Sequence, residues 1–451
     1  MTVTTPATRV DRALFTSLFL AVFLAMLCMS VVTIALPVIQ ADLGLDVGGM
    51  QWIINSYTLC LAGLALVGGT VGDRYGRRKA LLTGIALFVL GAALCALATD
   101  LTLLLVGRFV QGAGAALLVP GSMSLLSRNC PDPATRSRMM GLWGTVASLA
   151  IVIGPVVGGL LVGAWGWQGI FWVNVPMGAL AFALAWRSVP ESADPEHVAL
   201  DPLGQLLGIA WLVALCWGLI DAGQRGWSGL STILMVLAAV GLVVFVVVER
   251  RQERPMLPVR LFAGRRFSAA TVASFLLGFG SYSMFNFLPV YLQQVQHHLP
   301  QEAGLRMLPL PLAIMAVSVL AGRLAAARGD RTPMLLGYSL IAAGLLGLCL
   351  LAPDSPYLAV GGLFAVIGVG TGLAMAPTST AALTGAPPER SGMASAVVNA
   401  SRQTGIVVGV AVLGAVLPLG GLMSGFHLAS LIAGAATLIA VLAALLITPH
   451  P

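Results

Sequence analysis

Charged side chains are scarce in this chain, and one short segment holds many of them. The segment is GTVGDRYGRRK (69–79), and its charged residues are Asp73, Arg74, Arg77, Arg78 and Lys79. Only 9% of all residues are charged, so this concentration needs a physical reason. A carboxylate surrounded by guanidinium groups can form strong, directional ion pairs that tie neighbouring helices together. The glycines of the segment, among them Gly69 and Gly76, permit a tight turn between two such helices.

Two other arginines interrupt long apolar stretches. Arg108 lies about 10 Å inside its stretch, from the rise of a helix, and is followed by Gln111. Arg402 has the amides of Asn399 and Gln403 beside it. An arginine inside a membrane is costly unless it faces a polar cavity or a partner. We therefore expect both arginines to face a cavity, with a structural hydrogen-bonding role as the alternative for Arg402.

The sequence contains no recognisable catalytic or metal-binding motif. It has no HExxH, Gly-rich phosphate loop, nucleophile–base pair or Walker motif, and its six cysteines have no metal-ligand spacing. We expect no metal and no cofactor, and a membrane enzyme or a non-transporting receptor becomes a remote alternative. The net charge of +7 comes from basic residues in short loops without interleaved aromatics, which argues against a nucleic-acid partner.

The composition indicates that lipid surrounds the elements that position these residues. Of the 451 residues, 58% are hydrophobic, which leaves too few polar residues to cover a soluble core of this size. Apolar runs of about 20 residues recur, and a helix of that length crosses the hydrocarbon with its backbone hydrogen bonds satisfied. The predicted fold class is all-α integral membrane. We predict fourteen spans, at 14–38, 51–71, 80–98, 102–125, 139–163, 169–188, 203–221, 230–249, 269–293, 307–326, 333–352, 357–378, 393–417 and 426–447.

The basic residues predict which way these spans run. If the N-terminus is cytoplasmic, the clusters at 74–79, 128–138, 250–266 and 323–331 all become cytoplasmic, and about twenty of the 24 Lys and Arg residues lie inside. The opposite orientation would place nearly all of them outside. We therefore predict that both termini are cytoplasmic.

Two halves of the chain repeat one another in the same orientation. RSRMMGLWGTVASLAIVIG (136–154) is similar to RSGMASAVVNASRQTGIVV (390–408), and each follows a glycine-rich run closed by proline, at 111–120 and 368–377. A parallel repeat of this kind is typical of transporters whose substrate site lies between the halves, near the bilayer midplane. The expected organisation is a six-helix bundle (1–190), two extra spans with a cytoplasmic linker (191–266) and a second six-helix bundle (267–451).

Four segments, in chain order, carry a family resemblance. They are the 69–79 turn between the second and third spans, RFVQGAGAA (108–116) in the fourth, IGPVVGG (153–159) in the fifth and WGWQGIFWVNVPMG (165–178) at the start of the sixth. Together they resemble the motifs of the major facilitator superfamily, in its fourteen-helix drug:proton antiporter branch, and the similarity covers nearly the whole chain. The resemblance implies two pseudo-symmetric bundles plus two extra central helices in the cell membrane. It also implies a monomer that exports small amphiphilic compounds by alternating access in exchange for protons.

The resemblance also implies roles for individual residues. Asp73 and Arg77 would form a charge latch that is made in one conformation and broken in the other. The whole conformational gate would comprise Gly69, Asp73, Arg74, Gly76, Arg77 and Arg78. Arg108 would tune proton exchange, and Gln111 would line the cavity. The antiporter motif would be Gly154, Pro155, Gly158 and Gly159, whose proline and small residues also indicate a kinked, closely packed hinge.

The chain departs from the branch where a protonatable group is expected. The branch usually has an aspartate where this chain has Cys28, and an asparagine where it has Thr33. No carboxylate lies deep in a predicted span, and Asp42, Asp221 and Glu302 are expected to be solvated loop charges. Because arginine does not titrate usefully, proton coupling lacks its usual residue. A cavity without carboxylates favours largely apolar substrates that are neutral, anionic or weakly cationic.

Candidate substrate contacts can be named, although each residue type also suits plain packing. They are Met29, Thr33, Asn55, Tyr57, Trp143, Tyr282, Phe285 and Asn286. The main alternative keeps the fold and changes the task, to transport of one specific metabolite.

Overall fold

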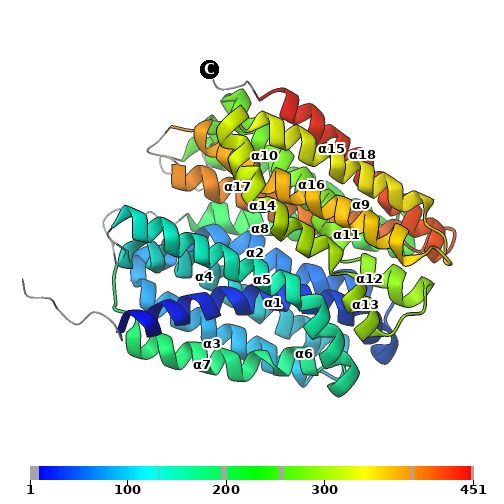
Figure 1. Ribbon diagram of the computed structural model, residues 1–451, viewed down its shortest axis with the longest axis horizontal. Coiled ribbons are helices and arrows are strands. Elements are labelled where there is room, and N and C mark those ends of the chain that lie inside the picture. Colours follow the sequence, from blue (N-terminus) through cyan, green and yellow to red (C-terminus); the bar gives the residue numbers. More distant parts are fainter. Residues whose placement is uncertain (1–9, 131, 194–200, 253–258, 388–390, 448–451) are drawn as a thin grey trace, which may run out of the picture.

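The computed structural model describes residues 10–130, 132–193, 201–252, 259–387 and 391–447, and these residues are almost entirely helical (Figure 1). Thirteen helices are long and apolar enough to cross a membrane. A fourteenth span forms if two segments of the second helix, Val47–Leu64 and Gly68–Tyr75, which meet at 49°, are counted together. The prediction of an all-α membrane fold is confirmed. The predicted break within 203–249 is also present, since separate helices cover 202–225 and 229–251.

The first bundle contains six spans and appears in blue to green in Figure 1. Its helices are α1 (Val10–Leu43), α2 (Val47–Tyr75), α3 (Arg77–Ala96), α4 (Leu101–Asn129), α5 (Pro133–Trp165), α6 (Gly169–Trp172) and α7 (Asn174–Ser188). Asp46, Asp100 and Asp132 cap the starts of α2, α4 and α5, each accepting a hydrogen bond from a backbone N–H of the first turn.

The second bundle repeats this arrangement with a more irregular first span. Its helices are η1 (Val259–Ala263), α10 (Arg265–Leu277), η2 (Gly278–Tyr282), α11 (Ser283–Phe285), α12 (Leu288–Val290), η3 (Tyr291–Val295), α13 (Pro300–Arg306), α14 (Pro309–Arg328), α15 (Arg331–Gly347), η4 (Leu348–Leu350), α16 (Tyr357–Thr384), α17 (Ser391–Val416) and α18 (Leu422–Leu445). The predicted span 269–293 is broken by two π-helical turns, η2 and η3, and such turns often mark functional sites.

The neighbours of each helix show the internal repeat. The first span of each bundle packs against the fifth, as α1 on α5 and α10 on α17. The third packs against the fourth, as α3 on α4 and α15 on α16. Between the bundles, the fifth span of each meets the second span of the other: α5 contacts α13 and α14, and α17 contacts α2. The similar segments 136–154 and 391–408 therefore occupy equivalent places at this interface; position 390 lies outside the described residues.

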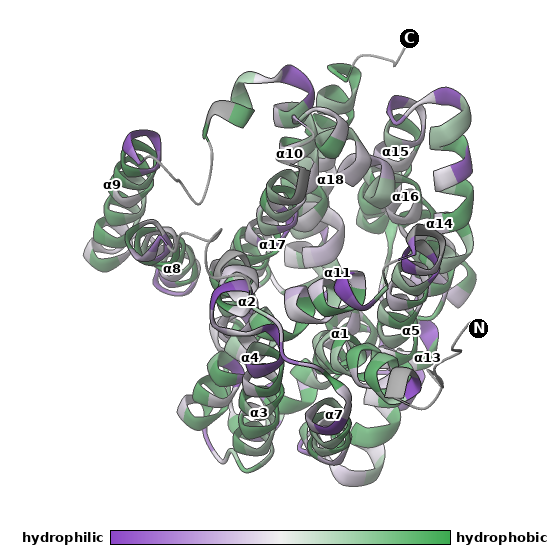
Figure 2. Ribbon diagram, turned by 90° about the vertical axis from the view of Figure 1, so that its left-hand side faces the viewer, coloured by the Kyte–Doolittle hydropathy of each residue, from purple (hydrophilic) through white to green (hydrophobic). Residues whose placement is uncertain are grey.

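The two extra spans, α8 (Pro202–Arg225) and α9 (Gly229–Arg251), lie to one side of both bundles (Figure 2). α8 packs on α2 and α17, whereas α9 contacts mainly α8. α9 leaves a row of aliphatic side chains exposed, as expected for a helix that faces lipid: Ile233, Val236, Leu237, Val240 and Val243.

Asp221, near the end of α8, is not a solvated loop charge, so that prediction is wrong. It is only 4% exposed and accepts hydrogen bonds from Arg225 and Ser228.

The turns between spans divide the molecule into two ends. The 69–79 turn shares one end with the turns that follow α4, α9 and α14, and we call it the basic end because arginines gather there: Arg74, Arg77, Arg78, Arg128, Arg250, Arg251, Arg265, Arg266, Arg328 and Arg331. The turns near 44–46, 166–168 and 296–299 mark the opposite end. The chain termini, at 1–9 and 448–451, and the loop segment 253–258 lie outside the described residues.

Candidate functional site

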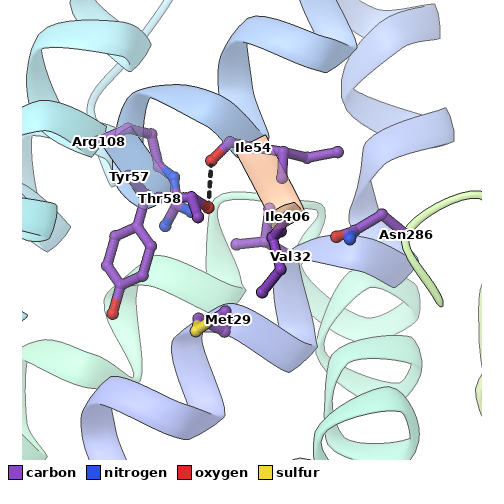
Figure 3. Close-up of a pocket in the computed structure, with 8 residues that line it drawn as sticks. All are labelled: Met29, Val32, Ile54, Tyr57, Thr58, Arg108, Asn286 and Ile406. Carbon is purple, nitrogen blue, oxygen red and sulfur yellow. Dashed lines mark hydrogen bonds between the residues drawn. The ribbon is translucent and has the colours of Figure 1, made fainter. Parts of the chain in front are cut away.

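A small cavity lies between the two bundles, inside the spans (Figure 3). Its volume is about 20 Å³, room for about one water molecule, so a drug-sized ligand requires the bundles to move apart. Side chains of α1, α2 and α4 line it together with side chains of the last bundle: Met29, Val32, Ile54, Tyr57, Thr58, Arg108, Asn286 and Ile406. Because both bundles contribute, relative movement of the bundles would open or close this space.

The sequence predictions identified part of this lining. Met29, Tyr57, Arg108 and Asn286 were expected and line the cavity. The lining residues without a sequence signal are Val32, Ile54, Thr58 and Ile406, whose types are common everywhere in the spans.

The remaining predicted contacts lie outside this lining in the present conformation. Thr33 donates to the Ser30 carbonyl of its own helix. Three others donate hydrogen bonds to side chains: Asn55 to Cys216 Sγ (3.2 Å), Trp143 to Ser122 Oγ (3.1 Å) and Tyr282 to Met375 Sδ (3.3 Å). Phe285 is half-buried on α11.

Arg108 is held in place by the close packing of α4. Gly112, one turn further along, lies against the backbone of Tyr57, where a methyl group would approach the carbonyl to 2.6 Å. This contact brings α4 close to α2 and directs the guanidinium of Arg108 toward α1 and α2. The side chain is 2% exposed, so the predicted orientation away from lipid is present.

All recorded partners of the Arg108 guanidinium are neutral. It donates to the Ile53 carbonyl (3.2 Å), to Cys28 Sγ (3.2 Å) and to Gln111 Oε1 (3.0 Å). It also lies 4.4 Å from the centre of the Tyr57 ring, a cation–π contact worth about 2 kcal/mol when desolvated. These hydrogen bonds use Nε and Nη1 of the guanidinium and do not neutralise its charge. Gln111 accepts a hydrogen bond from Arg108. The prediction that Gln111 lines the cavity is wrong for this conformation.

Arg402 lies on α17 of the second bundle, one turn before the cavity residue Ile406. It is half-buried, bonds to Asn399 Oδ1, and its guanidinium lies 5.9 Å from the centre of the Tyr282 ring. Gln403 is half-buried beside it, and Asn399 is exposed. Among the residues that the structure describes, neither Arg108 nor Arg402 has a carboxylate within ion-pair distance. In the same part of the chain, no cluster of three or more His, Cys, Asp or Glu side chains could hold a metal ion.

The 69–79 turn contains an ion pair within the first bundle. Arg77, at the start of α3, pairs with Asp73 at the end of α2 (2.6 Å) and donates to Ser124 Oγ on α4 (3.0 Å). Three helices are therefore tied together at the basic end in this conformation; that the pair breaks in another conformation stays a prediction. Arg77 is 9% exposed, so its charge depends on this pairing more than a solvated charge would.

The segment after α7 covers this turn. Arg78 donates its backbone N–H to Glu191 (3.2 Å) and its guanidinium to the Trp186 carbonyl (2.6 Å). Gly76 joins α2 to α3 with a φ of 118°, a value that favours glycine, and a methyl group there would meet the Glu191 carboxylate at 2.7 Å. The other predicted gate residues contribute less: Gly69 approaches Pro120, and Arg74 is exposed.

The predicted antiporter motif on α5 touches both bundles. Gly154 and Gly158 face α1, whereas Gly159 faces the start of α13 across the interface, where a methyl group would meet the Pro300 carbonyl at 2.5 Å. The Pro155 carbonyl borders Gly304 of α13. The motif thus forms a close contact between the two halves, near the opposite end.

Glutamine side chains complete the closure of the opposite end. Gln51 of α2 donates to the carbonyls of Val410 (3.0 Å) and Ala411 (2.7 Å) on α17. From the last bundle, Gln293 donates to the Ile34 carbonyl (2.9 Å) and Gln294 to Gln40 Oε1 (2.7 Å). These are the recorded hydrogen bonds between the two bundles over the described residues, and all lie toward the opposite end.

Comparisons with known proteins agree with this architecture. The sequence profile of the Major Facilitator Superfamily matches residues 18–410. The chain is 38% identical to Multidrug resistance protein Stp of Mycobacterium tuberculosis, over 88% of this chain and 74% of that protein. It is 34% identical to the Methylenomycin A resistance protein of Bacillus subtilis, over 96% of this chain and 94% of that protein.

Solved structures support the fold alone. A crystal structure of peptide transporter POT in complex with sulfate superposes with a TM-score of 0.70 at 18% identity, over 96% of this chain and 94% of that chain. The motifs, the paired bundles, the interbundle cavity and the matching profile agree, and the chain belongs to the Major Facilitator Superfamily.

Proposed function

We propose that this protein exports small amphiphilic compounds of the antibiotic type across the cell membrane by alternating access. The observation that carries the proposal is the cavity lined by both bundles, with interbundle hydrogen bonds toward one end of the molecule. The names of the relatives, which are resistance proteins for several drugs, support export as its direction.

The orientation follows from the positive-inside rule. The basic end carries most of the arginines, so we assign it, together with both termini, to the cytoplasm. The bonds of Gln51, Gln293 and Gln294 then close the outer side, and substrate enters the cavity from the cytoplasm.

Proton exchange is the proposed driving reaction, by resemblance to the antiporter branch. The proton carrier is not Arg108 or Arg402, because guanidinium groups stay charged. The test uses vesicles containing the purified protein and a pH-sensitive dye. Substrate addition should move protons in wild type. A variant of Asp42, Asp73 or Asp221 that abolishes the proton signal while substrate counterflow continues would identify the carrier, because loss of both at Asp73 is expected from its pairing with Arg77 alone. No proton movement in any of the four proteins would contradict antiport.

Drug accumulation tests export itself. The chain is expressed in a bacterium that lacks its main efflux pumps, and the intracellular levels of puromycin, ethidium and a set of other amphiphiles are measured. We expect lower accumulation of several compounds than in cells with the empty vector. If only one compound responds, the alternative of a single-metabolite transporter is favoured. If none responds, the export proposal is wrong.

A further inference from the structure

The space between the bundles is positively charged. Arg108 lines the cavity, and among the residues that the structure describes its partners are neutral and no carboxylate lies within ion-pair distance of it. The carboxylates of the described residues lie close to helix ends: Asp42, Asp46, Asp73, Asp100, Asp132, Glu191, Asp201, Asp221, Glu249, Glu302, Asp330 and Asp354. A buried cation without a counter-ion is unfavourable, and an anionic ligand would neutralise it.

Arg402 extends this positive region toward the basic end. It precedes Ile406, a cavity residue, by one helical turn on α17. Tyr282, which lies beneath the Arg402 guanidinium, precedes Asn286, another cavity residue, by the same spacing. Four residues of α-helix rise about 6 Å, so Arg402 lies just outside the cavity on the side of the basic end. A ligand that enters from that end therefore passes one guanidinium before it reaches the other.

The walls of the cavity around Arg108 are apolar. Met29, Val32, Ile54 and Ile406 supply thioether and aliphatic surface, and Asn286 supplies an amide on the side of the last bundle. This lining suits a hydrocarbon or aromatic skeleton that carries one polar group.

The geometry points to amphiphilic monoanions as the preferred substrates, with the acid group of the substrate paired to Arg108. This inference rests on the proposed export function and specifies its substrate class. An arginine binds a carboxylate or sulfonate through two parallel hydrogen bonds, which gives such ligands an advantage over neutral ones of the same shape.

Two probes with one skeleton test this preference. 8-Anilino-1-naphthalenesulfonate is a permanent anion, and N-phenyl-1-naphthylamine has the same rings without the sulfonate. Binding of both is measured by equilibrium dialysis against the full-length protein in lipid nanodiscs, with empty nanodiscs subtracted for partitioning into lipid. We expect the wild-type protein to bind the anion at least about tenfold more tightly than the neutral probe. Equal binding, or tighter binding of the neutral probe, would overturn the inference.

Two kinds of variant assign the preference to Arg108. Arg108→Gln removes the charge, and the anion should lose at least about tenfold in affinity while the neutral probe loses much less. Cys28→Asp leaves Arg108 in place and adds a carboxylate beside it, which should compete with the anion and lower its affinity similarly. Cys28→Asn has the shape of aspartate without the charge, so any loss that it shares with Cys28→Asp comes from shape. If Asp and Asn at this position have the same effect on the anion, the pairing with Arg108 is wrong.

The outcome separates this inference from the proposed function. If cells export ethidium or N-phenyl-1-naphthylamine while the purified protein shows no preference for the anion, export stands and the anion inference is overturned. If no compound is bound or exported, both are overturned. Should Arg108→Gln fail to fold, the two Cys28 variants and the wild-type probe pair still decide the question.

Discussion

Asp73 and Arg77 form the ion pair that joins α2 to α3 at the basic end. Asp73 lies in the last turn of α2, and Arg77 is the first residue of α3. Their spacing of four residues across Gly76 places Arg77 Nη2 2.6 Å from Asp73 Oδ1. Arg77 also reaches Ser124 on α4, a partner that no local pattern could have indicated, because the contact spans 47 positions. The same holds at Arg108: its depth in the span predicted a buried site, but its bond to the Ile53 carbonyl required the packed structure.

We predict that Asp73→Asn is made and inserted normally but transports at least about tenfold more slowly, a loss of ~1.4 kcal/mol. The reason is that Arg77 would remain nearly buried without its counter-ion, and the three helices would no longer be tied in one arrangement. Initial rates of dye export in vesicles provide the measurement. Asp100→Asn is the matched control, since asparagine also caps a helix and position 100 lies at the opposite end. Normal transport by Asp73→Asn would rule out the latch.

The boundaries of most helices could be predicted from the lengths of the apolar runs, because hydrocarbon thickness fixes the length of a span. The 203–249 segment also divided as expected, at the polar turn that precedes Gly229. The irregular span from Arg265 to Val295 could not be predicted. One of its two π-helical turns, η2, lies against α17, where a methyl group at Gly278 would collide with the Arg402 carbonyl. Contacts of this kind depend on the other half of the bundle and leave no period in the sequence.

The face of α5 that contacts α13 can be tested by a single substitution. Gly159→Leu would place a side chain where the Pro300 carbonyl lies, so α5 and α13 could not approach one another and the opposite end could not close. We expect an export rate at least about tenfold lower than wild type with normal yield of folded protein. The rate is measured in vesicles, and folding by thermal unfolding of the purified protein.

The same helix supplies a control for this substitution. Gly141 is exposed near the basic end, and a methyl group there meets nothing within 4 Å. Gly141→Leu therefore adds the same side chain to α5 without reaching the other bundle. If Gly159→Leu and Gly141→Leu transport equally well, the close approach at Gly159 is dispensable and the proposed closure is wrong.

For the whole molecule, the two bundles make one symmetric interface. The second span of each half meets the fifth span of the other, and in both places a glutamine side chain meets a glycine: Gln51 with Gly414, and Gln301 with Gly163. The sequence predicted two similar halves from the 136–154 and 390–408 segments, yet it could not predict which faces of them would meet. That choice depends on small residues spaced along α5 and α17 whose partners lie in the other half.

The central claim, that the two bundles move relative to one another around the cavity, is tested most directly by linking them at the opposite end. Gln40 and Gln294 contact one another across the interface at 2.7 Å. In a Gln40→Cys/Gln294→Cys protein, a short bis-methanethiosulfonate reagent should stop export, and dithiothreitol should restore it.

A pair inside one bundle controls for the chemistry: Gln296→Cys/Ser355→Cys joins residues of the last bundle at the same end, where Gln296 donates to the Ser355 carbonyl at 3.0 Å. We expect the reagent to block export only in the protein linked between Gln40 and Gln294. Undiminished export by that protein, with the link verified by mass spectrometry, would contradict it.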